Sequence, residues 1–341
     1  MEGDRIKVLS TLMFREEYLD KLQAVSPRLF VEQRSSWDPT DMVPYLKDVE
    51  VLYTFGLPPD LLESAPKLRW VQLHSAGVNH ILDHPIMASD IPITTTSGIH
   101  AVTIAEYVFA SILAFTRRVP RMVYWQGQGR WPEDKDRWPL FVPDELWGKT
   151  IGIVGYGSIG RQIARLAKAF GMRIVAAKKE ASDRLDRGYR LEGVGDPEGK
   201  LPDRIYPPER LRPMLAECDF VVVCVPVTRA TAKLIGEPEL KAMKPTAYLV
   251  NVARGEVVDE QGLITALQEG WIAGAGLDVF DQEPLPPNSP LYNLDNVILS
   301  PHVSGFTPYY DERASDLFAE NLRRYLAGEE LLNLVSKERG Y

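Results

Sequence analysis

The chain has 341 residues, of which 45% are hydrophobic and 25% are charged, a balance typical of globular proteins. Because one hydrophobic core rarely extends over so many residues, the length predicts two domains. The formal net charge of -8 weighs against binding to nucleic acid or to an anionic membrane surface.

We expect neither a secretion signal nor a membrane span. The first apolar run is mixed with charges, and the longest apolar stretches, 107–115 and 220–227, are too short to cross a bilayer. The cysteines, Cys218 and Cys224, lie in or beside one expected strand, where they are poorly placed to form a disulfide bond. We therefore expect a reduced, cytoplasmic protein.

The first half of the chain alternates short β-branched runs with amphipathic stretches, as in parallel sheets. The expected strands are 7–12, 49–55, 69–75 and 93–97, with a helix at 16–24. A long helix over 100–118 follows, because apolar residues recur there at helical spacing until Pro120. The stretch 125–147 has tryptophans among glycines and prolines and is expected to form a crossover or an interface arm.

The second half predicts a parallel sheet covered on both faces, because its strands are near-continuous apolar runs. The strands are expected at 150–155, 173–177, 220–225, 247–252, 273–279 and 297–300, and the helices at 159–170, 208–218, 238–243 and 259–268. The connection 183–204 is rich in charge, glycine and proline, and predicts an exposed loop. A last helix at 310–326 could pack back onto the first half.

A glycine-rich turn follows the strand at 150–155 and opens the next helix. It reads Gly155-Tyr156-Gly157-Ser158-Ile159-Gly160. The first glycine permits a tight turn, the second lets the backbone approach a pyrophosphate, and the third lets helix and strand pack closely. The flanking strand and helix favour a dinucleotide site over a glycine-rich turn in an empty domain.

These elements predict an α/β fold of two Rossmann-like, doubly wound parallel-sheet domains. Residues 1–118 and 304–341 are expected to form the outer, flavodoxin-like substrate domain, which is discontinuous. Residues 119–303 are expected to form the dinucleotide-binding domain.

The end of the second strand of this domain indicates which dinucleotide is bound. An acidic residue there normally accepts hydrogen bonds from the ribose hydroxyls, whereas this chain has Lys178 and Lys179. Because lysines bind a 2′-phosphate and accept nothing from a free hydroxyl, we expect NADP(H) to be preferred, with NAD(H) possible. In the alternative, both lysines are solvated and Glu180 takes the acid's place.

Three polar segments, 251–255, 278–284 and 300–305, end three strands of this sheet, at the edge where ligands of open parallel sheets bind. Reduction of a 2-keto acid needs a cation to hold the carboxylate and an acid to protonate the carbonyl oxygen, and Arg254 and His302 supply both. Glu283 could favour the protonated imidazole and fix its orientation. Taken singly, each could be a surface or loop residue; their convergence beside the glycine-rich turn favours a catalytic site.

At these residues the sequence resembles the D-2-hydroxyacid dehydrogenase family over nearly its whole length, and most of all its NADPH-using glyoxylate and hydroxypyruvate reductases. The matching motifs are the glycine-rich turn, CVPVT at 224–228 with Thr231, NVARGEVVDE at 251–260, GLDVFDQEP at 276–284 and SPHVSG at 300–305. The resemblance implies that Arg254 binds and polarises the substrate, that His302 is the general acid and base, and that Glu283 supports His302.

The resemblance implies further contacts in both halves. The backbone amides of Ala76 and Gly77, next to Ser75, would hold the substrate carboxylate, and Asp278 would lie near the nicotinamide carboxamide. The other implied cofactor contacts are Val225, Pro226, Thr231, Val252, Ala253, His302, Ser304 and Gly305. Two positions depart from the family pattern: His100 stands where many members have asparagine, which leaves its role open, and Lys178 replaces the usual aspartate.

The resemblance also implies a homodimer, and the arm with Trp125, Trp131, Trp138 and Trp147 offers a surface for it. Alternatively, these tryptophans cover the monomer's own core. No metal is expected, because the other histidines lack partners at metal-ligand spacing. Two rival functions stay open: a dinucleotide-sensing regulator similar to the co-repressors that resemble these dehydrogenases, and a dehydrogenase for bulkier 2-keto acids or for 3-phosphoglycerate.

Overall fold

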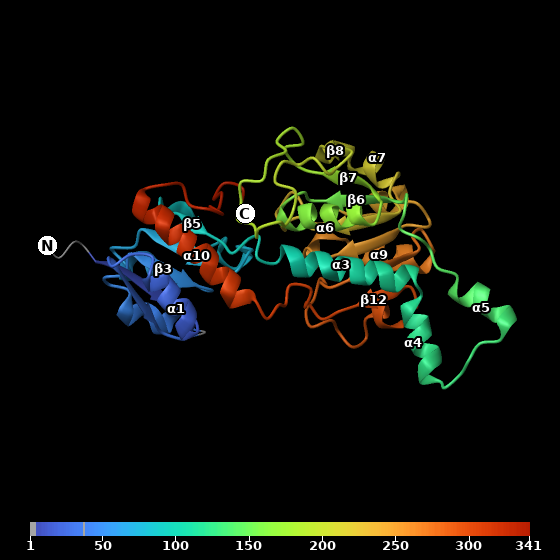
Figure 1. Ribbon diagram of the computed structural model, residues 1–341, viewed down its shortest axis with the longest axis horizontal. Coiled ribbons are helices and arrows are strands. Elements are labelled where there is room, and N and C mark those ends of the chain that lie inside the picture. Colours follow the sequence, from blue (N-terminus) through green and yellow to red (C-terminus); the bar gives the residue numbers. More distant parts are fainter. Residues whose placement is uncertain (1–4, 37) are drawn as a thin grey trace. The chain divides into compact units, whose positions relative to one another are not determined.

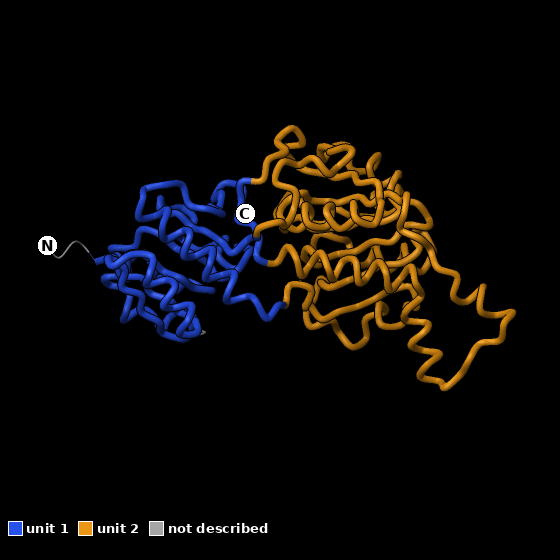
Figure 2. The backbone as a smooth tube through the Cα atoms, in the orientation of Figure 1, with its two compact units in different colours: residues 1–99, 187–191, 307–341 blue, residues 100–186, 192–306 orange. Residues whose placement is uncertain are grey.

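The computed structural model describes residues 5–36 and 38–341. The chain forms two compact units, which Figure 2 shows in different colours. Unit 1 contains the described residues up to Ile99, together with Arg187–Leu191 and Thr307–Tyr341, and unit 2 contains His100–Asp186 and Glu192–Phe306. The domain boundaries expected from the sequence stay a prediction.

Unit 1 is built on a parallel sheet of five strands (Figure 1). Their order in the sheet is β2-β1-β3-β4-β5. The strands are β1 (Ile6–Ser10), β2 (Leu29–Gln33), β3 (Val51–Thr54), β4 (Trp70–Leu73) and β5 (Ile93–Thr94). Helices α1 (Glu16–Gln23) and α10 (Tyr310–Ala327) pack on one face of this sheet, where Tyr53, Trp70 and Phe318 are fully buried. Helix α2 (Leu61–Ser64) packs on the other face, against Leu52 and Val71.

Unit 2 is built on a parallel sheet of seven strands in the order β12-β11-β10-β9-β6-β7-β8. The strands are β6 (Thr150–Val154), β7 (Arg173–Ala177), β8 (Arg204–Tyr206), β9 (Phe220–Val223), β10 (Tyr248–Asn251), β11 (Gly274–Leu277) and β12 (Val297–Leu299). Helices α3 (Ala101–Thr116) and α6 (Ser158–Ala169) cover one face. Helices α7 (Leu211–Leu215), α8 (Glu237–Ala242) and α9 (Glu260–Gln268) cover the other. The predicted fold of two doubly wound parallel sheets is confirmed.

Short 3₁₀ helices complete the two units at Pro39–Tyr45, Asn79–Ile81, Pro85–Ala88, Pro208–Arg210, Gly255–Val257 and Pro290–Asn293. In the described part of the chain, no helix has the length and apolar content that crossing a bilayer requires.

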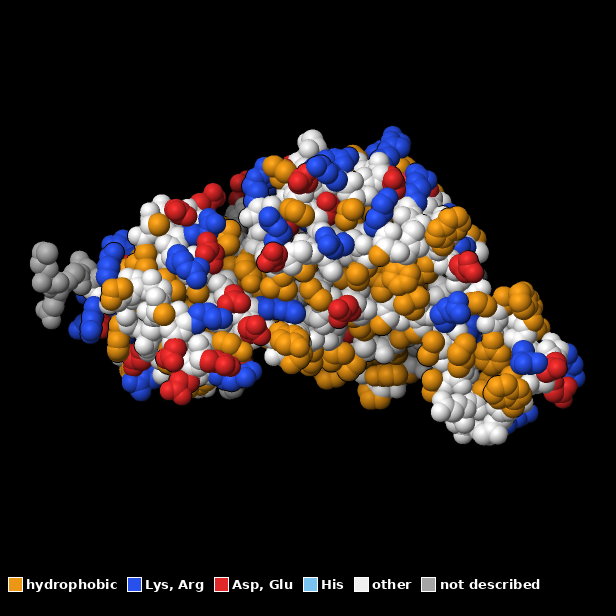
Figure 3. All heavy atoms as spheres, viewed as in Figure 1, with side chains coloured by type: hydrophobic (Ala, Val, Ile, Leu, Met, Phe, Trp, Pro, Cys, Tyr) orange, Lys and Arg blue, Asp and Glu red, His pale blue; other side chains and the backbone are white. Residues whose placement is uncertain are grey.

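The stretch between α3 and β6 forms an arm of two short helices, α4 (Val119–Gly127) and α5 (Asp134–Phe141). Neither helix buries any residue within the chain. Trp131 is 83% exposed and Trp138 is 75% exposed, and Figure 3 shows hydrophobic side chains gathered on this arm. Large aromatic rings are usually buried at least in part, so the exposed tryptophans of this arm form an unusual surface on this chain.

The connection between β7 and β8 corrects a prediction. An exposed loop was expected over 183–204, but Gly195 and Asp196 are buried, and Asp196 is 7% exposed. Burial of unpaired backbone groups is costly, and side chains of α6 pair with the polar backbone atoms of this loop. The loop can therefore be partly buried. Strand β8, which pairs with β7 at the end of this connection, was missed.

Candidate active site

The glycine-rich turn has the backbone geometry that a pyrophosphate site requires. Strand β6 ends at Val154 and α6 begins at Ser158, and Gly155 between them has a φ of +105°, which side chains rarely permit. A Cβ at Gly160 would lie 2.2 Å from the backbone oxygen of Gly155, so helix and strand pack too closely for a side chain. A Cβ at Gly157 would meet no atom within 4 Å, so the backbone there faces open space. These residues fit a dinucleotide at the N-terminus of α6.

The turn after β9 lies against the glycine-rich turn. The Cys224 thiol donates to the Gly155 backbone oxygen at 3.0 Å. The Thr231 hydroxyl donates to the Pro226 backbone oxygen at 2.6 Å, which closes the 226–231 turn on itself. Val225 and Pro226 are therefore held beside the N-terminus of α6, at the point where the strand order of the sheet reverses.

Lys178 is the first residue after β7, and its backbone N–H donates to the Tyr206 backbone oxygen of β8 at 3.0 Å. Its ammonium donates to the Asp183 backbone oxygen. Burial lowers the pKa of Lys178, and the nearby Arg161 lowers it further. Lys179 and Glu180 are exposed. A half-buried lysine thus occupies the strand end where an acid is usual.

Strands β10, β11 and β12 are neighbours in register, with Asn251 paired to Leu277 and Leu277 paired to Leu299. The three polar segments predicted from the sequence therefore begin at the same level of the same sheet edge. The N-terminus of α6 lies at this edge too, because β6 runs parallel to these strands in the same sheet.

His302 and Glu283 meet at this edge. The distance from His302 Nδ1 to Glu283 Oε2 is 2.7 Å, and Glu283 Oε1 accepts from the Phe280 backbone N–H at 3.1 Å. His302 has a left-handed backbone with a φ of +54°, which is unfavourable for a residue other than glycine and is held by a bond from its N–H to the Asp278 backbone oxygen at 2.9 Å. With Nδ1 engaged by the carboxylate, Nε2 is the nitrogen left to face a ligand.

Asp278 holds the segment that carries His302. Its carboxylate is fully buried and accepts from the Ser300 hydroxyl at 2.6 Å and from the backbone N–H groups of Val303 at 2.9 Å and Ser304 at 3.0 Å. The Tyr107 hydroxyl of α3 lies 2.7 Å from the Ser300 hydroxyl. Sequence reasoning missed the role of Tyr107, because a tyrosine on an apolar helix face gives no sign of a polar partner.

Arg254 follows β10 in a segment that is held by its own neighbours. Asn251 accepts from the Ala253 N–H at 3.1 Å and donates to the Arg254 backbone oxygen at 3.2 Å. A Cβ at Gly255 would lie 2.0 Å from Phe280 backbone atoms, so only glycine fits after Arg254. The guanidinium donates to the Ala253 backbone oxygen at 2.7 Å. Val252 and Ala253 are buried.

Residues after the last strand complete this edge. Ser304 is buried, and a Cβ at Gly305 would lie 3.3 Å from the His100 ring at the start of α3. His100 therefore packs against the backbone of a predicted cofactor segment. Among the described residues, no group of three or more His, Cys, Asp or Glu side chains could hold a metal ion.

In unit 1, the predicted substrate loop follows β4. The Ser75 hydroxyl donates to the Gly77 backbone oxygen at 2.7 Å, and Ala76 is exposed. His74 anchors the start of the loop: its ring lies 2.7 Å from the Tyr53 hydroxyl, and its backbone oxygen accepts from the Tyr310 hydroxyl at 2.5 Å. Burial lowers the pKa of His74 to about 4, so the ring is neutral near pH 7.

Known proteins are similar to this chain in sequence. The sequence profile of the D-isomer specific 2-hydroxyacid dehydrogenase NAD binding domain matches residues 109–304. The glyoxylate reductase of Pyrococcus furiosus is 40% identical over 298 residues, which cover 86% of this chain and 84% of that enzyme.

Solved structures are similar over the full length. A D-isomer specific 2-hydroxyacid dehydrogenase of Xanthobacter autotrophicus, in complex with NADPH and MES, is 29% identical with a TM-score of 0.77, covering 99% of this chain and 100% of that one. An NADPH-dependent glyoxylate/hydroxypyruvate reductase of Sinorhizobium meliloti, in complex with NADP and sulfate, is 25% identical with a TM-score of 0.76 and the same coverage. The chain therefore belongs to the D-isomer specific 2-hydroxyacid dehydrogenase family and is an NAD(P)-dependent dehydrogenase.

Proposed function

We propose that the protein uses NADPH to reduce a small 2-keto acid of the glyoxylate or hydroxypyruvate type to its 2-hydroxy acid. The observation that carries this proposal is the 2.7 Å pair of His302 and Glu283, at the sheet edge that also bears Arg254 and the glycine-rich turn. Relatives that match most of this chain are glyoxylate reductases, which supports the substrate class.

Each polar group has a chemical task in this reaction. The nicotinamide, when bound, supplies the hydride. His302 holds on Nε2 the proton that the substrate carbonyl oxygen receives, and Glu283 stabilises the imidazolium before transfer. Arg254 binds the substrate carboxylate and polarises the carbonyl.

Preference for NADPH rests on the strand end after β7. Lys178 follows β7 directly, so the alternative in which Glu180 takes the acid's place would need a shift of two residues. A lysine there attracts a 2′-phosphate and offers no acceptor to a free 2′-hydroxyl. The 155–160 turn is proposed to lie at the pyrophosphate of the cofactor. The rest of the cofactor is proposed to be lined by Val225, Pro226, Thr231, Val252, Ala253, Asp278, Ser304 and Gly305.

A panel of keto acids tests the function. The purified protein is expected to oxidise NADPH when offered glyoxylate or hydroxypyruvate, and NADH more slowly, because only NADPH carries the group that Lys178 would bind. The absorbance of the reduced cofactor measures both rates. A His302→Ala preparation, purified in the same way, shows whether a contaminating enzyme contributes.

Other results of the panel would replace the proposal. Turnover of aryl or branched keto acids alone would move the substrate class to bulkier molecules. Reduction of 3-phosphohydroxypyruvate alone, the keto acid that corresponds to 3-phosphoglycerate, would indicate a 3-phosphoglycerate dehydrogenase. Binding of NADPH with no turnover of any keto acid would favour the dinucleotide-sensing regulator.

We also propose a homodimer that forms through the arm. Tyr124, Trp131 and Trp138 of the arm are left exposed by this chain, and aromatic residues of this kind are enriched in protein interfaces. The wild type is expected to sediment at twice the mass of its 38.4 kDa chain, and the double variant Trp131→Ser, Trp138→Ser at the single mass. Tyr292→Ser is the matched control, because Tyr292 is 55% exposed in unit 2 and lies outside the arm. A monomeric wild type would contradict the proposed dimer.

A further inference from the structure

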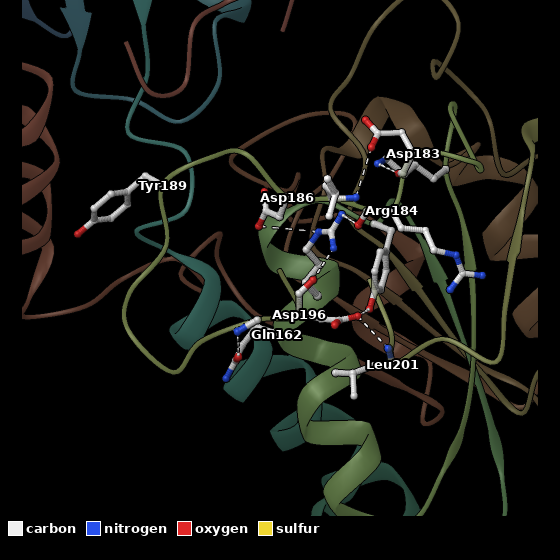
Figure 4. A network of polar contacts seen from close by, with 12 residues as sticks. Gln162, Asp183, Arg184, Asp186, Tyr189, Asp196 and Leu201 are labelled. Atoms are coloured by element: carbon white, nitrogen blue, oxygen red, sulfur yellow. Dashed lines mark hydrogen bonds and ion pairs between the residues drawn. The ribbon is translucent and has the colours of Figure 1, made fainter. Parts of the chain in front are cut away.

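The β7–β8 loop, residues 181–203, is bound to helix α6 and to the glycine-rich turn. It contains no regular helix or strand, yet both its ends are tied to the rest of unit 2 by polar contacts with Tyr156, Arg161 and Gln162. Figure 4 shows Asp183, Arg184, Asp186 and Asp196 of this loop in one network of polar contacts. Ordering a loop of this length costs much conformational entropy, so the contacts that hold it call for a structural or functional explanation.

Asp196 is the centre of these contacts. Its carboxylate is 7% exposed and accepts from the Tyr156 hydroxyl at 2.6 Å and from the backbone N–H groups of Lys200 and Leu201, both at 3.0 Å. Tyr156 lies between the first two glycines of the turn, so its side chain ties the loop to the backbone that would hold the pyrophosphate. On α6, Gln162 accepts from the Gly195 N–H at 2.8 Å and adds a second tie.

Arg161 of α6 joins the two ends of the loop. Its side chain is 1% exposed, and its terminal nitrogens donate to the Asp196 backbone oxygen at 2.5 Å and to the Arg184 backbone oxygen at 2.8 Å. Its charge lies 4.9 Å from the centre of the Tyr156 ring. The Arg161 Nε has no hydrogen-bond partner, and the Asp186 carboxylate is 3.8 Å away. A buried guanidinium held mainly by backbone oxygens fixes where those oxygens lie.

The residue before Arg184 is the partner of Lys178. The Lys178 ammonium donates to the Asp183 backbone oxygen, one peptide away from the oxygen that Arg161 holds. A continuous series of contacts thus runs from Asp196 through Arg161 and the 183–184 backbone to the lysine at the strand end.

We propose that Asp196, Tyr156 and Arg161 are positioning residues that hold the β7–β8 loop so that Lys178 is fixed for the 2′-phosphate of NADPH. This inference rests on the proposed NADPH preference and extends it to residues that the phosphate does not touch. A lysine on a flexible stem loses rotamer freedom when it binds an anion, and a loop that already orders the stem removes that cost. NADH lacks the 2′-phosphate, so it gains nothing from an ordered Lys178.

The affinity for two cofactors, measured without turnover, tests the positioning role. In Asp196→Ala the Kd of NADPH is expected to rise about tenfold, the effect of losing one well-placed charged contact, while the Kd of NADH changes less than about twofold. Glu198→Ala is the matched control, because it removes a carboxylate from the same loop at a position that is 60% exposed and is expected to leave both Kd values unchanged. Tyr156→Phe removes only the hydroxyl that binds Asp196 and decides the case if Asp196→Ala does not fold.

Wild type and Lys178→Ala, measured alongside, separate two failures. A wild type that binds NADH as tightly as NADPH, or a Lys178→Ala variant that keeps the wild-type ratio of Kd values, contradicts the proposed cofactor preference. If Lys178→Ala loses the ratio while folded Asp196→Ala and Tyr156→Phe keep it, only the positioning role is wrong. An equal rise in both Kd values would also overturn the positioning role, since a merely structural loop would weaken both cofactors alike.

Discussion

Replacing His302 with alanine is expected to lower kcat by a factor of about 10² to 10⁴ while the Kd of NADPH changes less than about twofold. The variant lacks the proton donor for the carbonyl oxygen, so charge builds up on that oxygen as hydride arrives. The Arg254 segment and the glycine-rich turn do not depend on the His302 side chain in any contact described above, so cofactor binding is expected to survive. Steady-state kinetics with glyoxylate and direct titration with NADPH measure the two quantities.

Glu283→Gln separates the orientation of the imidazole from its charge. The glutamine oxygen can still accept from His302 Nδ1, but it carries no charge to stabilise the imidazolium. We therefore expect a kcat that lies between those of wild type and His302→Ala.

The matched control for His302→Ala is His80→Ala, because His80 is an exposed histidine of unit 1 whose ring binds the Phe55 backbone oxygen at 2.7 Å. A folded His302→Ala protein with wild-type kcat would remove His302 from the chemistry.

The precision of this site comes from Asp278 as much as from the histidine. The Asp278 carboxylate uses both oxygens on the segment 300–304, and its backbone oxygen accepts from the His302 N–H. The left-handed backbone of His302 is therefore held by Asp278 both at His302 itself and at the residues that follow it. This fixed backbone places the His302 side chain within reach of Glu283. Preorganisation of this kind lets a half-exposed imidazole act at a defined point.

The sequence predicts the sheet of unit 2 well because its strands are buried on both faces. Runs such as Phe220–Val223 and 248–250 are apolar without interruption, and they stand out from the amphipathic helices between them. The edge strands β2 and β8 were missed because they are not fully buried. Strand β2 exposes Phe30 at 47%, and β8 has only three residues, so neither gives a continuous apolar run.

Burial that depends on distant partners was not predictable. The composition of the β7–β8 loop is that of an exposed loop, and Asp196 is buried because Tyr156, 40 residues earlier, supplies the partner. The pairing of Asp278 with the backbone of Val303 and Ser304 is equally non-local. The sequence identified the polar residues at the strand ends, since the carboxyl ends of parallel strands share one edge. It also predicted that Glu283 would orient His302, but it did not indicate that Asp278 would pair with the 303–304 backbone.

Replacing Arg254 with leucine is expected to lower kcat/KM for glyoxylate by between about 30-fold and 3000-fold, the range for losing a buried charged contact. The guanidinium is proposed to bind the substrate carboxylate in the ground state and the developing oxyanion in the transition state, so KM rises and kcat falls together. Arg254→Lys keeps the charge but not the planar fork of donors, and its kcat/KM is expected to lie between the two.

The control for Arg254 is Arg212→Leu, which removes a surface arginine of the same unit that pairs with Glu239 at 2.8 Å. This variant is expected to keep wild-type kinetics. If Arg254→Leu changed only the Kd of NADPH and left the KM of glyoxylate unchanged, Arg254 would serve the cofactor and another cation would have to hold the substrate. If Arg254→Lys were fully active, a positive charge at this position would suffice, and the planar fork of guanidinium donors would not be needed.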